Sequence, residues 1–144
     1  MKPTKRTIPL LIRNPADPRQ ILAVRRARDD PEHPGLWGLP AGSFREGEST
    51  LDLIRRIGED KLGVDLTPVR VVRSGQQGRE TYLLQMDLWE VRITSGAPQA
   101  RTGGSHGISY YDCVEWAPPE ILTDGRSKGS LCCRLGLVAC GVSS

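Results

Sequence analysis

The chain has 144 residues, and its 20 lysines and arginines against 17 aspartates and glutamates give a formal net charge of +3. This length fits a single domain over residues 1–144, which buries enough surface to fold without a metal or a disulfide. A hydrophobic fraction of 38% argues against wholesale disorder. The small net charge and an aromatic fraction of 5% exclude an obvious nucleic-acid polymer as partner.

No apolar run reaches the ~18 residues of a membrane span, and no signal-peptide core follows the basic segment 1–6. We therefore expect a cytoplasmic protein with no membrane partner. The cysteines do not form a C-x-x-C pair, so the pattern favours small apolar residues in a reducing compartment over a zinc site. The sequence defines no further role for them: Cys113, Cys132, Cys133 and Cys140.

The first predicted elements are short and separated by turns. In chain order they are strands at 10–12 and 21–24 around a turn at 14–18, a loop at 29–35, an extended piece at 37–39 and a turn at 40–42.

The clearest predicted helix covers residues 49–62. Ser49 and Asp52 form a capping-box signal at its start, and Gly63 is placed to end it. Gly58 lies in its interior, where glycine is expected to cost about 1 kcal/mol relative to alanine.

The remaining elements alternate in type. They are strands at 69–72 and 82–93, a Gly-, Pro- and Ser-rich loop at 94–107, a strand at 109–116, a short turn or helix at 118–122 and a terminal helix at 131–140. This order predicts an α/β or α+β sandwich with a mixed sheet.

The most specific segment is 34–48, which leads directly into the predicted helix. Five residues fit the pattern G-x5-E-x7-R-E-U-x-E-E-x-G-U, in which U is apolar: Gly42, Glu48, Arg56, Gly63 and Val64. This spacing resembles the box of the Nudix hydrolases. The resemblance covers nearly the whole chain and implies a single Nudix-type α/β/α sandwich, with the mixed sheet between the box helix and a C-terminal helix.

The resemblance also implies a chemistry. Acids on one face of the box helix jointly bind Mg²⁺, which neutralises a diphosphate and positions a water against phosphorus. The implied partner is a nucleotide or another small molecule that contains a diphosphate. Gly42, Arg56 and either Arg25 or Arg26 are the implied substrate contacts. Relatives often pair as homodimers, and the sequence leaves the oligomeric state open.

The box departs from the pattern at its acids. The three helix acids fall on Ile57, Asp60 and Lys61, so only Asp60 keeps a carboxylate. Two unit charges ~4 Å apart repel by about 4 kcal/mol at an effective dielectric constant of ~20, and a divalent ion feels about twice that from a lysine. We therefore expect Mg²⁺ to bind weakly or not at all at Glu48 and Asp60. The Lys61 ammonium is expected near the substrate phosphates instead.

The candidate catalytic residues are Glu48, Asp60, Lys61 and His106. His106 lies in the glycine-rich loop and is a replacement for the general base, because its unperturbed pKa suits neutral pH. Each residue also has an alternative without chemistry. Glu48 lies near a helix N-terminus, Asp60 can pair with Arg56, Lys61 is a last-turn cation, and loop histidines are commonly only solvated.

Three functions are compatible with these residues. The first is a Nudix-type hydrolase of a diphosphate-containing small molecule, with impaired or atypical metal dependence. The second is a catalytically inactive nucleotide- or diphosphate-binding module, and the third is altered, metal-independent chemistry within a biosynthetic pathway. The sequence does not identify the substrate, whose selectivity is expected to come from the loops at 27–34 and 94–107.

Overall fold

The computed structural model describes residues 2–30, 33–100 and 111–142. The strands are β1 (Thr4–Leu11), β2 (Arg13–Asn14), β3 (Asp17–Arg26), β4 (Trp37–Gly38), β5 (Ala41–Ser43), β6 (Asp65–Gly78), β7 (Leu83–Ser95) and β8 (Tyr111–Ala117). The helical segments are α1 (Thr50–Arg56), the π-helix η1 (Ile57–Leu62), the 3₁₀ turn η2 (Pro119–Leu122), α2 (Thr123–Ser127) and α3 (Leu131–Ala139). In this part of the chain, none of the helices has the length and apolar character that crossing a membrane requires.

Two sheets organise the molecule. The first has the order β5-β1-β7-β6, with β1 and β7 parallel and the other pairs antiparallel, so the predicted mixed sheet is confirmed. The second is antiparallel and forms around β3, which pairs with β2, β4 and β8. The sequence analysis did not predict this second sheet. The predicted strands all correspond to observed ones, although β1, β3 and β6 are longer than the patterns indicated.

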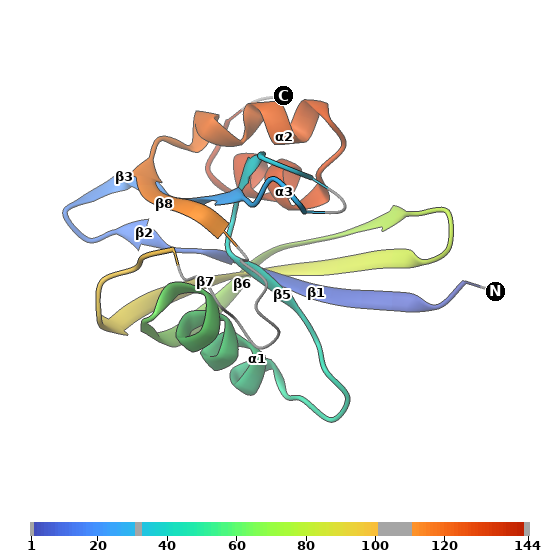
Figure 1. Ribbon diagram of the computed structural model, residues 1–144, viewed down its shortest axis with the longest axis horizontal. Coiled ribbons are helices and arrows are strands. Elements are labelled where there is room, and N and C mark those ends of the chain that lie inside the picture. The colour runs from blue at the N-terminus through green and yellow to red at the C-terminus, as the bar shows by residue number, and fades with distance from the viewer. Residues whose placement is uncertain (1, 31–32, 101–110, 143–144) are drawn as a thin grey trace.

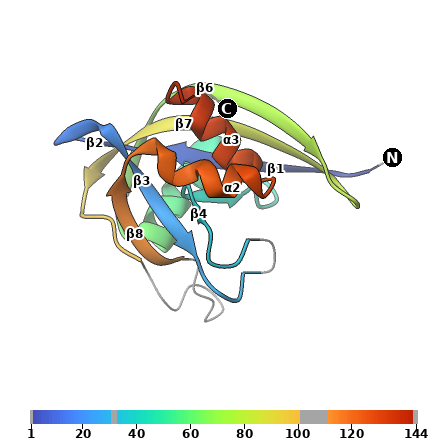
Figure 2. The ribbon, with the colours of Figure 1, turned by 90° about the horizontal axis from the view of Figure 1, so that it is seen from above.

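Helices cover the sheets on opposite sides (Figure 1), with α1 on one side and α2 and α3 on the other. Figure 2 shows α3 lying across β6 and β7. Successive side chains of a strand point to opposite faces, so Leu10 packs with the core beneath α1 and Leu11 with the core beneath α3. The predicted α/β/α arrangement is therefore present.

The prediction of a turn at 40–42 is wrong, because Ala41–Ser43 is the strand β5 and pairs antiparallel with β1. Gly42 serves close packing rather than a turn. A Cβ added there would lie 2.8 Å from Cγ1 of Ile57 and 3.1 Å from Cδ1 of Leu53. The missing side chain therefore lets the box helix lie directly against β5.

The predicted ends of the box helix are confirmed, but its regular α-helical interior is not. The Ser49 hydroxyl accepts a hydrogen bond from the Asp52 amide at 3.1 Å, and Gly63 ends the helix with φ +72°. From Ile57 onward the helix is π-wound, with hydrogen bonds to the fifth rather than the fourth preceding residue. Gly58 lies in this wider turn, against the carbonyl oxygen of Val64 and the side chain of Leu66.

Replacing Gly58 with alanine tests this packing. A Cβ there would lie 2.7 Å from the Val64 carbonyl oxygen and 2.9 Å from Cγ of Leu66. We expect G58A to lower the free energy of unfolding by about 1–3 kcal/mol, because the crowding includes backbone, whereas helix propensity alone predicts a gain. Gly78 in β6 has open space around it, so G78A is the control and should lose no stability. Urea denaturation compares the two, and a G58A protein as stable as wild type would contradict the packing.

Candidate functional site

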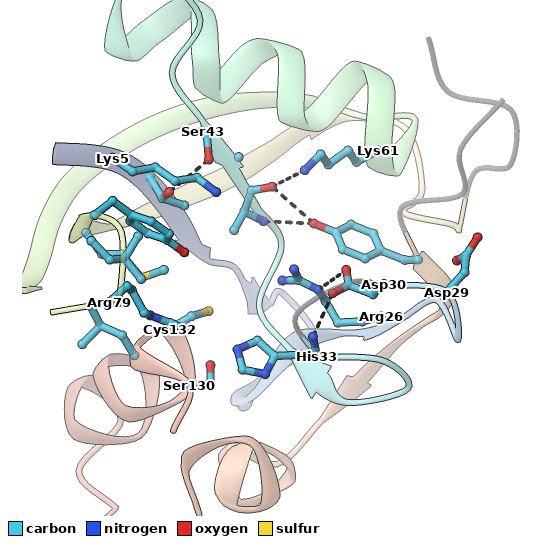
Figure 3. A pocket seen from close by; sticks show the side chains of 18 residues that line it. Lys5, Arg26, Asp29, Asp30, His33, Ser43, Lys61, Arg79, Ser130 and Cys132 are labelled. Carbon is cyan, nitrogen blue, oxygen red and sulfur yellow. Dashed lines mark hydrogen bonds and ion pairs between the residues drawn. The ribbon is translucent and has the colours of Figure 1, made fainter. Parts of the chain in front are cut away.

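A cavity of about 440 Å³ lies between β1, β5, β7 and the N-terminal end of α3 (Figure 3). Its volume is in the range of small-molecule binding sites. Among the described residues, its walls carry four basic and two acidic side chains: Lys5, Arg26, Lys61, Arg79, Asp29 and Asp30. The surplus of positive charge indicates an anionic ligand.

The predicted site residues divide into two groups. Gly42, Arg26 and Lys61 line the cavity. The described lining residues do not include four others that were predicted for the site: Glu48, Asp60, Arg25 and Arg56. His106 lies outside the described residues.

Lys61 projects from η1 onto the cavity wall, where its ammonium donates a hydrogen bond to the Ala41 carbonyl oxygen at 2.5 Å. The Tyr111 ring lies beside it, with its centroid 5.7 Å from Nζ, and the Tyr111 hydroxyl accepts a hydrogen bond from the Ala41 amide at 3.0 Å. Burial, with the nearby Arg26 and Arg56 cations, lowers the pKa of Lys61 to about 8. The amine therefore stays mostly protonated at neutral pH.

Glu48 and Arg56 form a bidentate ion pair away from the cavity lining. Arg56 Nε and one terminal nitrogen each donate to a Glu48 oxygen at 2.8 Å, and the same terminal nitrogen donates to the Ser43 carbonyl. The hydrogen bonds from Arg56, with further help from the Arg45 amide, lower the pKa of Glu48 to about 2 despite its burial. The expected pairing of Asp60 with Arg56 is thus replaced by a pair that fixes the loop before α1 to the end of that helix.

Arg25 and Arg26 end β3, where the pairing with β8 shifts register between them. Arg26 reaches the cavity and pairs with Asp30 at 2.9 Å, while Arg25 pairs with Asp112 at 2.6 Å. The Asp30 carboxylate also accepts the backbone amide of His33 at 2.9 Å, which fixes His33 on the cavity wall. The structure therefore selects Arg26 as the arginine of the pair that faces the cavity.

The residues at the box do not fit a divalent-metal cluster. Ile57 occupies the first acid position and is fully buried against Gly42. A cation, Lys61, occupies the third, and both Glu48 oxygens accept hydrogen bonds from Arg56. Within residues 2–30, 33–100 and 111–142, no group of three His, Cys, Asp or Glu side chains is arranged to hold a metal ion. This chain thus presents an ammonium where a Nudix box would present carboxylates.

Several lining residues were missed by the sequence analysis. Lys5 lies near the start of β1, while Arg79 and Tyr82 lie in the turn between β6 and β7. The parallel pairing that sets Lys5 opposite Leu84 brings these distant segments together. A basic residue near a strand end carries no signal by itself, so only the register of β1 on β7 could have identified them.

The comparisons with known proteins agree with this architecture. A family model described as NUDIX domain matches residues 3–128, so the chain belongs to the Nudix family. None of the curated proteins compared with it matches significantly in sequence.

Solved structures of low sequence identity share the fold. A NUDIX hydrolase from Nitrosomonas europaea superposes with a TM-score of 0.72 at 13% identity, covering 96% of this chain and 88% of the other. A MutT protein from Methanosarcina mazei Go1 gives 0.67 at 18%, covering 85% and 83%. An ADP-ribose pyrophosphatase from Streptococcus suis 89-1591 gives 0.65 at 17%, covering 95% and 90%.

The Glu48–Arg56 pair makes a pH-dependent prediction. Because the folded pKa of Glu48 lies near 2, below its ordinary 4.5, the carboxylate stabilises the fold above pH 4.5, and this contribution is lost as the pH falls toward 2. E48Q should therefore be less stable than wild type by about 1–3 kcal/mol at neutral pH, with a difference that shrinks in acid. Glu46 is exposed in the same loop, so E46Q is the control. Urea denaturation across this pH range measures both, and an E48Q deficit that is independent of pH would argue against the ion pair.

Proposed function

We propose that this Nudix domain binds a small molecule containing a diphosphate, of the nucleotide kind, and that it does so without the metal cluster of the box. The single observation that carries the proposal is the Lys61 ammonium on the cavity wall at Ala41. A protonated amine there attracts phosphate oxygens directly and repels a divalent cation.

The charges on the cavity wall support this choice of ligand. Arg26 pairs with Asp30 at 2.9 Å, and Lys61 donates a hydrogen bond to the uncharged carbonyl of Ala41. A ligand phosphate placed between them would be contacted by an ammonium and a guanidinium together. The printed name of the Streptococcus suis protein with this fold, ADP-ribose pyrophosphatase, is consistent with a diphosphate ligand.

Hydrolysis with atypical metal dependence is the second candidate. It is favoured by Asp30 and His33, which line the same cavity as Lys61 and are linked by a hydrogen bond from the His33 amide. A neutral imidazole can accept a proton from an attacking water. In this alternative, His33 takes the part that the sequence analysis gave to His106.

Removing the Lys61 charge tests the binding proposal. We expect K61Q to bind ADP about tenfold more weakly than wild type, because a charge-assisted hydrogen bond to phosphate is lost. Arg55 lies on the same helix but is exposed and pairs only weakly with Asp52 at 3.7 Å, so R55Q loses the same charge away from the cavity. Isothermal titration measures each affinity. If K61Q and R55Q bind ADP equally weakly, the loss reflects only the net charge of the protein, and the proposal is contradicted.

The metal dependence separates the two candidate functions. We expect ADP and ADP-ribose to raise the melting temperature equally in Mg²⁺ and in EDTA, with no release of monophosphate or phosphate in either. Release that persists in EDTA and is lost in H33Q would establish the metal-independent hydrolase instead. Release that requires Mg²⁺ would show that a metal cluster forms and would overturn the proposed function.

A further inference from the structure

Arg79 lines the cavity and carries an unsatisfied donor. Its Nε is buried and has no hydrogen-bond partner in the described part of the chain, although the residue lines the cavity. A buried donor without an acceptor is costly, and most such groups in proteins are paired. The described residues therefore leave the Arg79 guanidinium short of acceptors.

The turn that carries Arg79 is fixed in place. The Arg79 amide donates to the Tyr82 carbonyl at 2.8 Å, and the Lys2 ammonium donates to the Arg79 carbonyl at 2.6 Å. Lys5 lies next to this turn, with its Nζ 5.6 Å from the centre of the Tyr82 ring. Two cationic side chains, Lys5 and Arg79, are therefore held at one end of the cavity by the β6–β7 turn and β1.

This end lies across the cavity from Lys61. Figure 3 shows Lys5 and Arg79 on one side, with Lys61, Arg26 and Asp30 on the other. Apolar side chains that line the cavity come from β7 and from the start of α3: Leu84, Met86 and Leu131. The two positive regions are thus part of one cavity whose wall also includes an uncharged surface.

The two ends differ in their acids. Both lining carboxylates, Asp29 and Asp30, belong to the loop after β3, which lies on the Lys61 side in Figure 3. Among the described lining residues, no carboxylate accompanies Lys5 and Arg79. Their positive charge is therefore not neutralised by a partner in the cavity wall. The planar guanidinium of an arginine presents parallel donors that match the oxygens of a phosphate.

We propose that Lys5 and Arg79 form a second anion subsite, and that the ligand carries a further phosphate on its nucleoside part, remote from the diphosphate. This inference rests on the proposed function, since it takes the diphosphate to lie at Lys61 and Arg26. The apolar side chains that line the same cavity would contact an uncharged part of the ligand. The class of ligand is thus a nucleotide phosphorylated at two separate positions.

The test compares ADP with ADP that carries one more phosphate on its ribose, at the 2′ or the 3′ hydroxyl. The ligands differ only in the group that the second subsite would bind. We expect one of the two phosphorylated forms to bind wild type at least about tenfold more tightly than ADP, because its additional phosphate gains a charge-assisted hydrogen bond. In R79Q the ratio between the affinity for this phosphorylated form and the affinity for ADP should fall toward one.

A matched control lies on the strand that leads into this turn. Arg73 of β6 is exposed and is not among the lining residues, so R73Q loses the same charge but should keep the wild-type ratio. K5Q supplies a second variant that lies outside the turn, and its ratio should also fall. Thermal unfolding confirms that each variant is folded before titration.

The outcomes separate the two proposals. If no nucleotide binds wild type, the proposed function fails, and this inference fails with it. If ADP binds but neither additional phosphate improves its affinity, the second subsite alone is overturned. A ratio that falls in R73Q as much as in R79Q would also overturn it, because the preference would then reflect only the net charge of the protein.

Discussion

The contact between Lys61 and the carbonyl oxygen of Ala41 joins the box helix to β5, and it holds a positive charge at the cavity wall. The same peptide unit of Ala41 offers its amide to the Tyr111 hydroxyl, so the helix, β5 and β8 meet at one residue. Burial disfavours the charged amine, yet it stays mostly protonated at neutral pH. The ammonium therefore adds to the positive charge of a cavity wall that also carries Lys5, Arg26 and Arg79.

The matches to the Nudix pattern and the departures from it have different physical meanings. Gly42 and Gly63 match because the backbone requires them, one for close approach to Ile57 and one for a left-handed helix end. Glu48 and Arg56 match because they bind each other at 2.8 Å. The retained part of the pattern is therefore accounted for by packing and by one ion pair. The departures at Ile57 and Lys61 fall on the positions where carboxylates would hold a metal.

The sequence predicted the elements that local chemistry determines. The helix start at Ser49, its end at Gly63 and the strands β1, β6 and β7 follow from capping and hydrophobic patterns. The π-winding from Ile57 could not be predicted, because it depends on how Gly58 packs against Val64 and Leu66. Strand β5 was mistaken for a turn because a Pro-Ala-Gly segment gives a turn signal that its pairing with β1 overrides.

Residues of the cavity could be predicted from the sequence only where they lie in or near the Nudix pattern. Lys61 was expected there from its position in the box, and either Arg25 or Arg26 from the end of a strand; the structure places Lys61 and Arg26 at the cavity. Lys5 and Arg79 are separated by most of the mixed sheet in sequence, and only long-range pairing of β1 with β7 makes them neighbours.

The close packing of Ile57 against Gly42 also limits which side chains position 57 can carry. Ile57 is fully buried, so a glutamate at that position would place a carboxylate in the hydrocarbon interior beside Leu53, where it would be held neutral and could not serve as a ligand. Exchanging Ile57 alone for glutamate would therefore not supply a usable carboxylate to the box. The helix would also have to turn this position away from Leu53 and Gly42.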